Sequence, residues 1–160
     1  MKTILKLSVL LFAFLLISCG GKEEKNKPSY GKKKVTSVAD NTLASEKIDL
    51  TNKGVGPIKA ITLEAAINQE MAAQGAKVFN NMCTACHRAD RKFIGPSPQG
   101  ILKKRTPEWV MNMILNPDEM VQKDPLAKQL LIEFNGSPMA NQNLSEEDAR
   151  AVLEYFRTLK

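Results

Sequence analysis

The chain has 160 residues, 43% of them hydrophobic and 25% charged, which suits one domain with extensions and is too short for two sizeable cores. Its formal net charge of +6 is distributed unevenly. Residues 64–160 hold twelve basic and twelve acidic side chains, whereas residues 19–63 hold nine basic and five acidic ones. The neutral C-terminal part argues against a nucleic-acid-binding fold, because phosphate binding needs positive charge on the folded surface itself.

Residues 1–18 have the pattern of a targeting segment. Lys2 and Lys6 precede an apolar run that ends at Ile17, which is typical of a secretory signal and is too short to span a membrane. The following Leu16-Ile17-Ser18-Cys19 resembles the lipobox of bacterial lipoproteins, in which the cysteine becomes the acylated first residue. We therefore expect a lipid anchor at Cys19 on the periplasmic side of a bacterial membrane. The alternative is an ordinary signal peptide that contains a cysteine.

Residues 19–61 lack hydrophobic periodicity, and they include dense charge near the start and Gly54-Val55-Gly56-Pro57 near the end. Such a composition buries too little apolar area to offset the entropy of ordering, so it predicts a flexible polar linker. Lys22-Glu23-Glu24 also resembles the charged export signal of surface lipoproteins. Display on the cell surface is therefore open beside a plain solvated linker.

Residues 62–160 predict an all-α domain of about four helices, because hydrophobic residues recur there every three or four positions. We expect the first helix over 63–80. Thr106-Pro107 begins a second, which Asn116-Pro117 ends, since a capping hydroxyl and a first-turn proline favour a helix start. Asp124-Pro125 begins a third that closes at Asn135-Gly136, and Ser145 caps the last, with acidic residues in its first turn.

The motif between the first two helices is Cys83-Thr84-Ala85-Cys86-His87, the attachment pattern of c-type haem. Two thiols three residues apart on one helical turn can reach the two vinyl groups along one edge of the porphyrin, and the adjacent histidine can bind the iron. A thioredoxin-like dithiol would need a βαβ pattern, which this chain lacks. A structural zinc site needs four ligands, and only three residues remain once Cys19 carries lipid.

On these residues the chain resembles class I cytochrome c over roughly Leu63 to Lys160. The resemblance rests on Gly75 and Phe79 before the haem motif, Gly95-Pro96 after it, a proline–methionine loop, and Tyr155-Phe156 in the last helix. It implies a helical shell around one covalently attached haem c, with the first and last helices crossing at Gly75 and Phe79. In that family the Gly-Pro proline offers its carbonyl to the proximal imidazole, here Pro96 to His87.

The sixth iron ligand cannot be a histidine, because His87 is the only one in the chain. Met139 lies in an irregular loop, 52 residues after His87 and just before the last helix, where the family places its axial methionine. Met120 is a weaker candidate, and an open or water-bound site is a further alternative. The family's usual proline after the methionine is here Ala140, which leaves the loop less rigid.

Two more residues are candidates for the haem propionates: Trp109 through its indole N–H and Arg105 through its guanidinium. A core tryptophan and an exposed arginine are the alternatives. Basic residues also crowd the window 88–105 and suggest a docking surface for an acidic partner, although such runs are often only solvated; they are Arg88, Arg91, Lys92, Lys103, Lys104 and Arg105.

An iron bound by histidine and methionine has no open position, so it passes single electrons rather than activating substrate. The sequence therefore predicts a membrane-tethered monohaem cytochrome c, not an enzyme, that passes electrons between respiratory complexes or to a terminal oxidase or reductase. The stretch 106–134 resembles small cytochromes encoded beside nitrous oxide reductases. The alternatives are a haem-based sensor or peroxidase-like enzyme with a labile distal methionine, and a thiol–disulfide lipoprotein with free cysteines.

Overall fold

The computed structural model describes residues 42–160. The expected signal peptide, the lipidation site at Cys19 and the first part of the linker lie outside the described residues. Within 42–160, no helix has the length and apolar content needed to cross a membrane.

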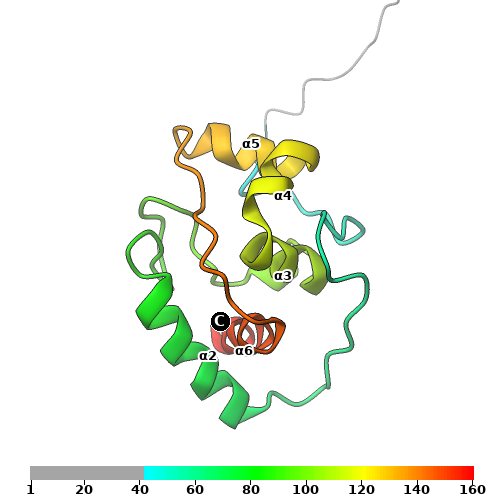
Figure 1. Cartoon of the computed structure of the whole chain (residues 1–160), viewed down its shortest axis with the longest axis vertical. Helices are drawn as coiled ribbons and strands as arrows, with labels where there is room; N and C mark the ends of the chain where they lie inside the picture. Colours follow the sequence, from blue (N-terminus) through cyan, green and yellow to red (C-terminus); the bar gives the residue numbers. More distant parts are fainter. Residues whose placement is uncertain (1–41) are drawn as a thin grey trace, which may run out of the picture. The chain divides into compact units, whose positions relative to one another are not determined.

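The described chain is all-helical, with no strand beyond an isolated bridge between Asp49 and Arg105. Five α-helices and a short 3₁₀ turn follow one another: α2 (Gln69–Met82), η2 (Ile101–Lys103), α3 (Pro107–Leu115), α4 (Pro117–Lys123), α5 (Pro125–Glu133) and α6 (Glu146–Thr158). Figure 1 shows α2 and α6 on one side of the molecule and α4 and α5 on the other, with α3 between them. The predicted all-α fold class is confirmed.

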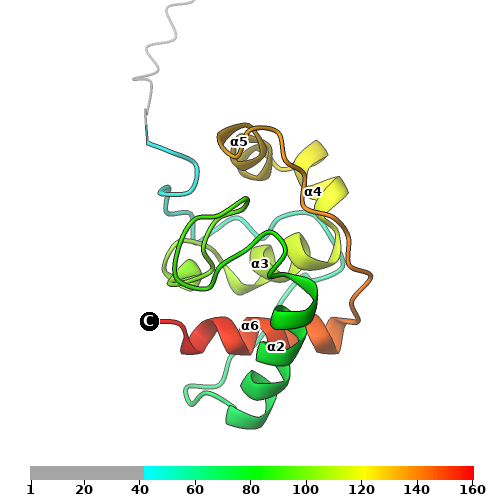
Figure 2. The same ribbon diagram turned by 90° about the vertical axis from the view of Figure 1, so that its left-hand side faces the viewer.

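α2 and α6 cross at close range, and Figure 2 shows the two helices lying across each other. A Cβ added to Gly75 would lie 1.9 Å from the backbone oxygen of Ala151, so no side chain fits at this point. One turn later, the Phe79 ring lies 5.5 Å from that of Tyr155 and 5.7 Å from that of Phe156, in tilted and edge-on geometries. The structure thus places the crossing at the residues that the resemblance implied.

Glu154 fastens the start of α2 to α6. Its carboxylate is 1% exposed and accepts from Arg150 and Arg157 at 2.6 Å, and from the backbone N–H of Asn68 at 2.8 Å. Arg157 also donates to the carbonyl oxygen of Glu64 at 2.6 Å. This arrangement explains why α2 starts at Gln69 and not at residue 63 as predicted. The carbonyl oxygens of residues 64–66 accept hydrogen bonds from the Arg157 guanidinium and not from the backbone N–H groups of a helix.

The other helix starts follow the capping pattern. Thr106, Asp124 and Ser145 each accept from a backbone N–H in the first turn of their helices. α4 is the element that the sequence did not predict. Asn116-Pro117 ends α3 as expected, but Pro117 also occupies the first turn of a new helix, where a missing N–H costs nothing.

Residues 42–61 differ from the expected flexible linker. We call them the strap, because Figure 1 shows this segment running past α5 and α3 toward α2. Ala44 and Ile58 are buried, and the side chain of Asn112 on α3 accepts from Ile58 N and donates to its carbonyl oxygen, both at 2.9 Å. Residues Ala39–Lys160 accordingly form one compact unit. Composition suggested a linker because the few apolar residues here lack a period, although Ala44 and Ile58 are buried against the rest of the domain.

Candidate haem-binding site

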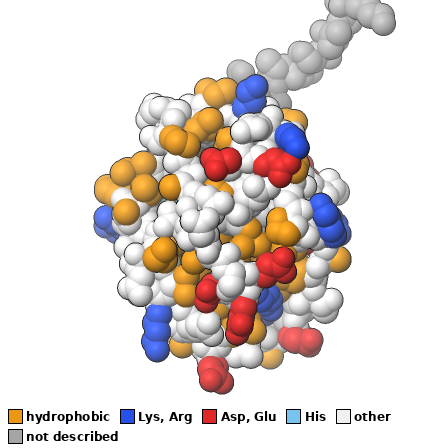
Figure 3. All heavy atoms as spheres, viewed as in Figure 1, with side chains coloured by type: hydrophobic (Ala, Val, Ile, Leu, Met, Phe, Trp, Pro, Cys, Tyr) orange, Lys and Arg blue, Asp and Glu red, His pale blue; other side chains and the backbone are white. Residues whose placement is uncertain are grey.

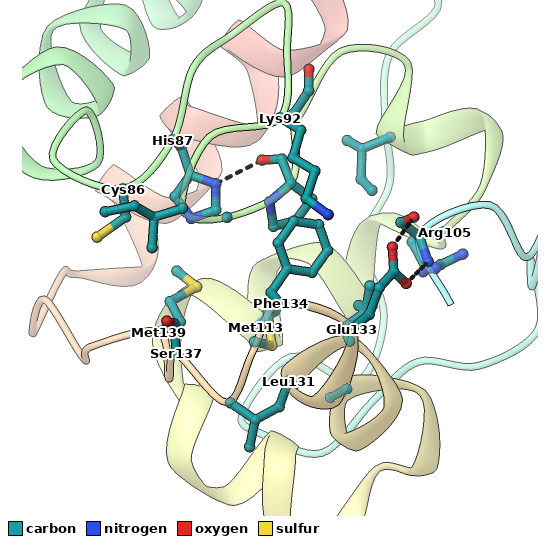
Figure 4. Close-up of a pocket in the computed structure, with 18 of the residues that line it drawn as sticks. Cys86, His87, Lys92, Arg105, Met113, Leu131, Glu133, Phe134, Ser137 and Met139 are labelled. Carbon is teal, nitrogen blue, oxygen red and sulfur yellow. Dashed lines mark hydrogen bonds between the residues drawn. The ribbon is translucent and has the colours of Figure 1, made fainter. Parts of the chain in front are cut away.

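A cavity of about 530 Å³ lies between the loop after α2, the helices α3 and α5, and the loop before α6. Its volume falls in the range of ligand and cofactor pockets. The predicted residues Cys86, His87, Pro96, Arg105, Trp109 and Met139 all line it. Figure 4 shows His87 and Met139 entering this cavity from opposite sides.

Cys83 and Cys86 occupy one helical turn that continues α2. The backbone N–H groups of Cys86 and His87 donate to the Cys83 carbonyl oxygen at 3.1 and 2.9 Å, and Cys83 N–H donates to Phe79. This turn brings Cys86 and His87 to the same cavity wall. Burial, and then the neighbouring Cys86, raise the pKa of the Cys83 thiol. That direction opposes a thiolate nucleophile and so disfavours the thiol–disulfide alternative.

His87 is held in one tautomer by its neighbours. Its Nδ1 lies 2.8 Å from the Pro96 carbonyl oxygen. Because a carbonyl oxygen only accepts, Nδ1 carries the proton and Nε2 keeps a free lone pair for a metal. A Cβ on Gly95 would lie 2.4 Å from Cε1 of the imidazole, so Gly95 lets the chain pass directly behind the ring.

The opposite wall carries two thioethers. Met139 comes from the loop before α6, and Figure 4 shows its side chain pointing toward His87. Met113 lines the cavity from α3. Met120, the weaker candidate, does not line the cavity: it is fully buried under the strap, where its sulfur accepts from Val55 N–H at 3.0 Å.

Trp109 lines the cavity, but its indole N–H points elsewhere than predicted. Nε1 donates to Asp124 Oδ1 at 3.3 Å, and the same oxygen caps α5 by accepting from Ala127 N–H at 2.7 Å. The indole N–H that the sequence offered to a propionate thus bonds to the N-cap residue of the neighbouring helix in this structure.

Arg105 is 1% exposed, so the alternative interpretation of it as an exposed arginine is wrong. Two of its nitrogens donate to backbone carbonyl oxygens, among them that of Ala44 in the strap at 2.6 Å. Its Nε is the one buried side-chain polar atom without a hydrogen-bond partner among the described residues. Desolvation lowers the pKa of the guanidinium, and Asp49, Asp124 and Glu133 oppose that effect. Arg105 as a whole lines the cavity, and its charge suits a group that carries carboxylates.

Burial removes Arg105 from the expected basic docking surface. Arg88 lies 4.1 Å from the centre of the Phe93 ring, and Lys92 lies 4.5 Å from that of Phe134. Lys104 pairs with Glu46 at 3.0 Å. In the view of Figure 3, basic and acidic side chains are interspersed with hydrophobic ones, and neither sign of charge predominates.

Two further polar residues at the cavity carry no signal in the sequence. Ser45 of the strap donates from its backbone N–H and its hydroxyl to Glu133 of α5, at 2.8 and 2.5 Å, and both residues line the cavity. Ser45 and Glu133 are 88 positions apart in the chain, so only the fold reveals their contact.

No group of three or more His, Cys, Asp or Glu side chains within residues 42–160 could hold a bare metal ion. The donor set instead fits haem c: two thiols on one turn, an imidazole with a free Nε2, a thioether opposite it and a buried guanidinium beside the cavity.

Comparison with known proteins agrees with this donor set. The family model described as Cytochrome c matches residues 72–160. A comparison with curated protein sequences finds no match.

Among solved structures, cytochrome c from Rhodothermus marinus is similar at 44% identity and a TM-score of 0.63, covering 73% of this chain and 93% of that one. An engineered form of the R. marinus protein, bound to a carbene intermediate, has 44% identity and a TM-score of 0.61, with 73% and 94% coverage. The structural match covers more of the chain than residues 72–160, so it extends beyond the family model. This chain therefore belongs to the cytochrome c family, and its domain carries a covalently attached haem c with its iron.

Proposed function

We propose that this cytochrome c is a lipid-anchored electron carrier that serves respiratory complexes or a terminal oxidase or reductase outside the cytoplasm, and that it is not an enzyme. The observation that carries the proposal is the pairing of an imidazole and a thioether on opposite walls of one cavity. Two such ligands leave no position for a substrate.

Each residue has a separate task in this proposal. Haem c supplies one-electron exchange between ferrous and ferric iron. Cys83 and Cys86 hold it through thioether bonds, and His87 offers Nε2 as the proximal ligand. Pro96 fixes the imidazole through the bond at Nδ1 and makes it a stronger donor. Met139 offers the soft sulfur on the other side, which favours the ferrous state and raises the reduction potential.

Redox titration and spectra test this function directly. The purified holoprotein is expected to cycle reversibly with one electron, to show a low-spin ferric spectrum and to resist carbon monoxide. A high-spin ferric spectrum with ready carbon monoxide binding would contradict the electron-carrier proposal and would favour a haem-based sensor or peroxidase-like enzyme.

The proposed membrane tether rests on the lipobox that ends at Cys19. Multiple acyl chains on one cysteine hold a protein stably at a membrane. Cys19→Ala should release the holoprotein into the soluble fraction with an unchanged absorption spectrum. Continued sedimentation with membranes at high salt would place the anchor elsewhere.

The proposed partner is a redox protein with an acidic docking patch. Two apolar side chains in the loop after the haem motif, Phe93 and Ile94, are 47% and 46% exposed. They follow Lys92 in the chain, and the guanidinium of Arg88 lies over the Phe93 ring. An apolar centre with a charged rim is typical of transient interfaces. Lys92→Glu should slow electron transfer to an acidic partner at low salt, whereas Lys128→Glu, on α5, should have a smaller effect. Nitrous oxide reductase is one candidate acceptor, on the resemblance of residues 106–134.

One observation favours a second candidate, a haem-based sensor or peroxidase-like enzyme. In the described structure, the hydrogen bonds of residues 138–144 stay within that loop, from Gln142 to Ala140 and from Asn143 to Asn141. A weakly fastened loop can withdraw Met139 and open the iron. The engineered R. marinus cytochrome, whose structure holds a carbene intermediate, belongs to the same fold.

A further inference from the structure

Large hydrophobic side chains are exposed at two places in the described structure. One group lies at the end of α2 and in the loop after the haem motif: Met82, Phe93 and Ile94. The other group lies on the strap and on α5 and is more exposed: Leu43 at 58%, Ile48 at 71%, Leu50 at 56% and Ile132 at 70%. We call these last four residues the apolar patch. The proposed partner surface includes Phe93 and Ile94, whereas electron transfer by itself gives the apolar patch no role.

The strap and α5 meet along one seam. Ser45 donates to Glu133 from its backbone N–H and its hydroxyl, and Lys47 Nζ donates to Gln129 Oε1 at 3.3 Å. Ile132 is exposed on α5 in the stretch between these two contacts. The seam thus joins segments more than 80 positions apart in the chain and brings the exposed side chains of the strap beside that of Ile132.

Ile48 and Leu50 share the outer side of the strap. Asp49, between them, forms the bridge with Arg105, and its backbone N–H donates to the carbonyl oxygen of Lys104 at 2.9 Å. In an extended segment, the residues on either side of such a position point to the same face. Both side chains are accordingly more exposed than Asp49. The fold therefore gathers these apolar groups on one surface, and exposed clusters of this kind mark contact surfaces.

The start of the described chain brings the apolar patch close in sequence to the proposed lipid anchor. Thr42, the first described residue, borders the same groove between strap and α5 as Ile48. Only residues 20–41 separate Thr42 from Cys19. A coil of about 22 residues averages about 25 Å from end to end, so a surface on such a tether meets the membrane at an effective concentration in the millimolar range. A weak affinity for lipid is then sufficient for contact.

Charge also suits a lipid surface with anionic headgroups. Residues 20–41 contain six lysines and three acidic residues. At the seam, Glu46 pairs with Lys104 at 3.0 Å, and the exposed Lys128 lies one turn before Ile132 on α5. Basic residues beside exposed apolar ones are typical of proteins that bind the interface of anionic membranes.

We propose that the apolar patch rests on the phospholipid bilayer that holds the lipid anchor, so that the haem domain docks on the membrane in one orientation. The inference rests on the anchor of the proposed function. Figure 1 shows most of the strap on the side of the molecule away from the loop that follows α2. Docking through the apolar patch therefore leaves that loop open to a redox partner.

Linear dichroism of the haem band on a supported bilayer tests the orientation. The full acylated holoprotein should show a dichroic band, because docking fixes the angle between the covalently held haem and the membrane. Ile48→Ser combined with Leu50→Ser should lower the dichroism by about threefold or more, with the same amount of haem retained and an unchanged spectrum. Phe93→Ser removes an exposed apolar side chain that does not line the cavity, and it should keep the dichroism of the unmodified protein.

Vesicle binding by the unacylated protein tests the apolar patch without the anchor. Cys19→Ala holoprotein should partition onto vesicles of phosphatidylcholine and phosphatidylglycerol with a constant on the order of 10³–10⁴ M⁻¹, no stronger than a single acyl chain gives. That affinity is too weak to hold the protein on washed membranes. Adding Ile48→Ser and Leu50→Ser should weaken the partitioning by about tenfold, whereas adding Phe93→Ser should leave it unchanged.

The anchor and the docking can fail separately. If the acylated protein stays on the supported bilayer but its haem band is isotropic, the docking is overturned and the anchor stands. If the protein washes off, the anchor fails, and vesicle binding decides the role of the patch: weaker binding of the double serine variant supports docking, and equal binding overturns it. If Cys19→Ala holoprotein forms a dimer without lipid and Ile48→Ser disrupts that dimer, the patch is a self-association surface and the proposal is overturned.

Discussion

The two walls of the haem cavity are built in different ways. The proximal wall is a short stretch of chain in which each residue is fixed by a near neighbour: Gly95 N–H donates to Cys86 at 2.8 Å, His87 bonds to Pro96, and Ser97 bonds to Ala89 at 2.7 Å. The distal wall is a loop from Phe134 to Leu144, with left-handed residues at Asn135, Gly136 and Asn143. Its first three residues donate to α5, and from Ser137 onward its hydrogen bonds stay within the loop.

This difference separates two requirements of an electron carrier. The proximal imidazole must stay in one tautomer and orientation, because the covalent haem is attached to the same turn. The distal sulfur sets the potential and excludes other ligands, and a looser loop can meet that need through packing of Met139 and Leu144 against the core. Substitutions on the proximal wall should therefore damage the holoprotein, whereas those on the distal wall should change the iron and spare the fold.

The largest effect is expected on the proximal wall. Cys83→Ala or Cys86→Ala leaves a single thioether and should lower the yield of covalent haem severely, by tenfold or more, whereas Met139→Ala should not. A haem stain after denaturing electrophoresis measures attachment. A normal yield of covalent haem in both cysteine variants would refute the assignment of Cys83 and Cys86 as the attachment residues.

On the distal wall, Met139→Ala should open the iron, turn the ferric spectrum high-spin, lower the potential and permit carbon monoxide binding. Met139→His should stay six-coordinate with a lower potential. Two controls are matched to the other nearby methionines. Met113→Leu keeps the cavity filled and Met120→Ala empties a core position, so the second should lose about 2–5 kcal/mol of stability without a spectral change. A high-spin spectrum in either control would identify that residue as the ligand.

A pair of glycines compares the walls directly. Gly95→Ala would place a methyl group 2.4 Å from the imidazole, so the ring must move and the potential and spectrum should both change. Gly136→Ala meets no atom within 4 Å but has a φ of +71°, so it should cost about 1 kcal/mol of stability and leave the iron unchanged. Equal spectra for both variants would show that the proximal wall is as adaptable as the distal one.

Glu154 lies on neither wall and tests the shell that carries both. Burial would raise the pKa of this carboxyl, but Arg150, the Asn68 amide and Arg157 together hold the pKa below its usual value. The folded state therefore binds this proton less readily than the unfolded chain. Its contribution to stability is complete at neutral pH and is lost as the pH falls from about 4.3 through the lower folded value.

Glu154→Gln should accordingly reduce stability at pH 7 by about 2 kcal/mol, and the difference from the unmodified protein should narrow below about pH 4. Urea unfolding across this range measures it. A constant difference at every pH would show that the carboxylate charge contributes nothing.

The smallest effect is expected from Ala140→Pro, which restores the proline that the family usually has after its methionine. Ala140 is exposed, and its N–H takes no part in the hydrogen bonds of the loop. Proline should stabilise the bound loop by about 0.5–1 kcal/mol by restricting its open forms. The gain is measured as a rise in the pH or temperature at which the low-spin ferric spectrum of the protein is lost. An unchanged or lower value would mean that the loop is already fastened by packing.

The chemistry of this protein follows largely from local sequence. The spacing of Cys83, Cys86 and His87, the Gly95-Pro96 pair and the helix caps at Thr106, Asp124 and Ser145 act over a few residues, so their geometry is encoded where they stand. Only the tertiary structure decided what residues far apart do. It gave the Trp109 donor to Asp124, buried Met120 under the strap, and placed Arg105 against the carbonyl groups of residues 58 and 61 positions earlier. The physical reason is that buried polar groups take whichever partner the packing brings, and no period or motif in a single chain records that choice.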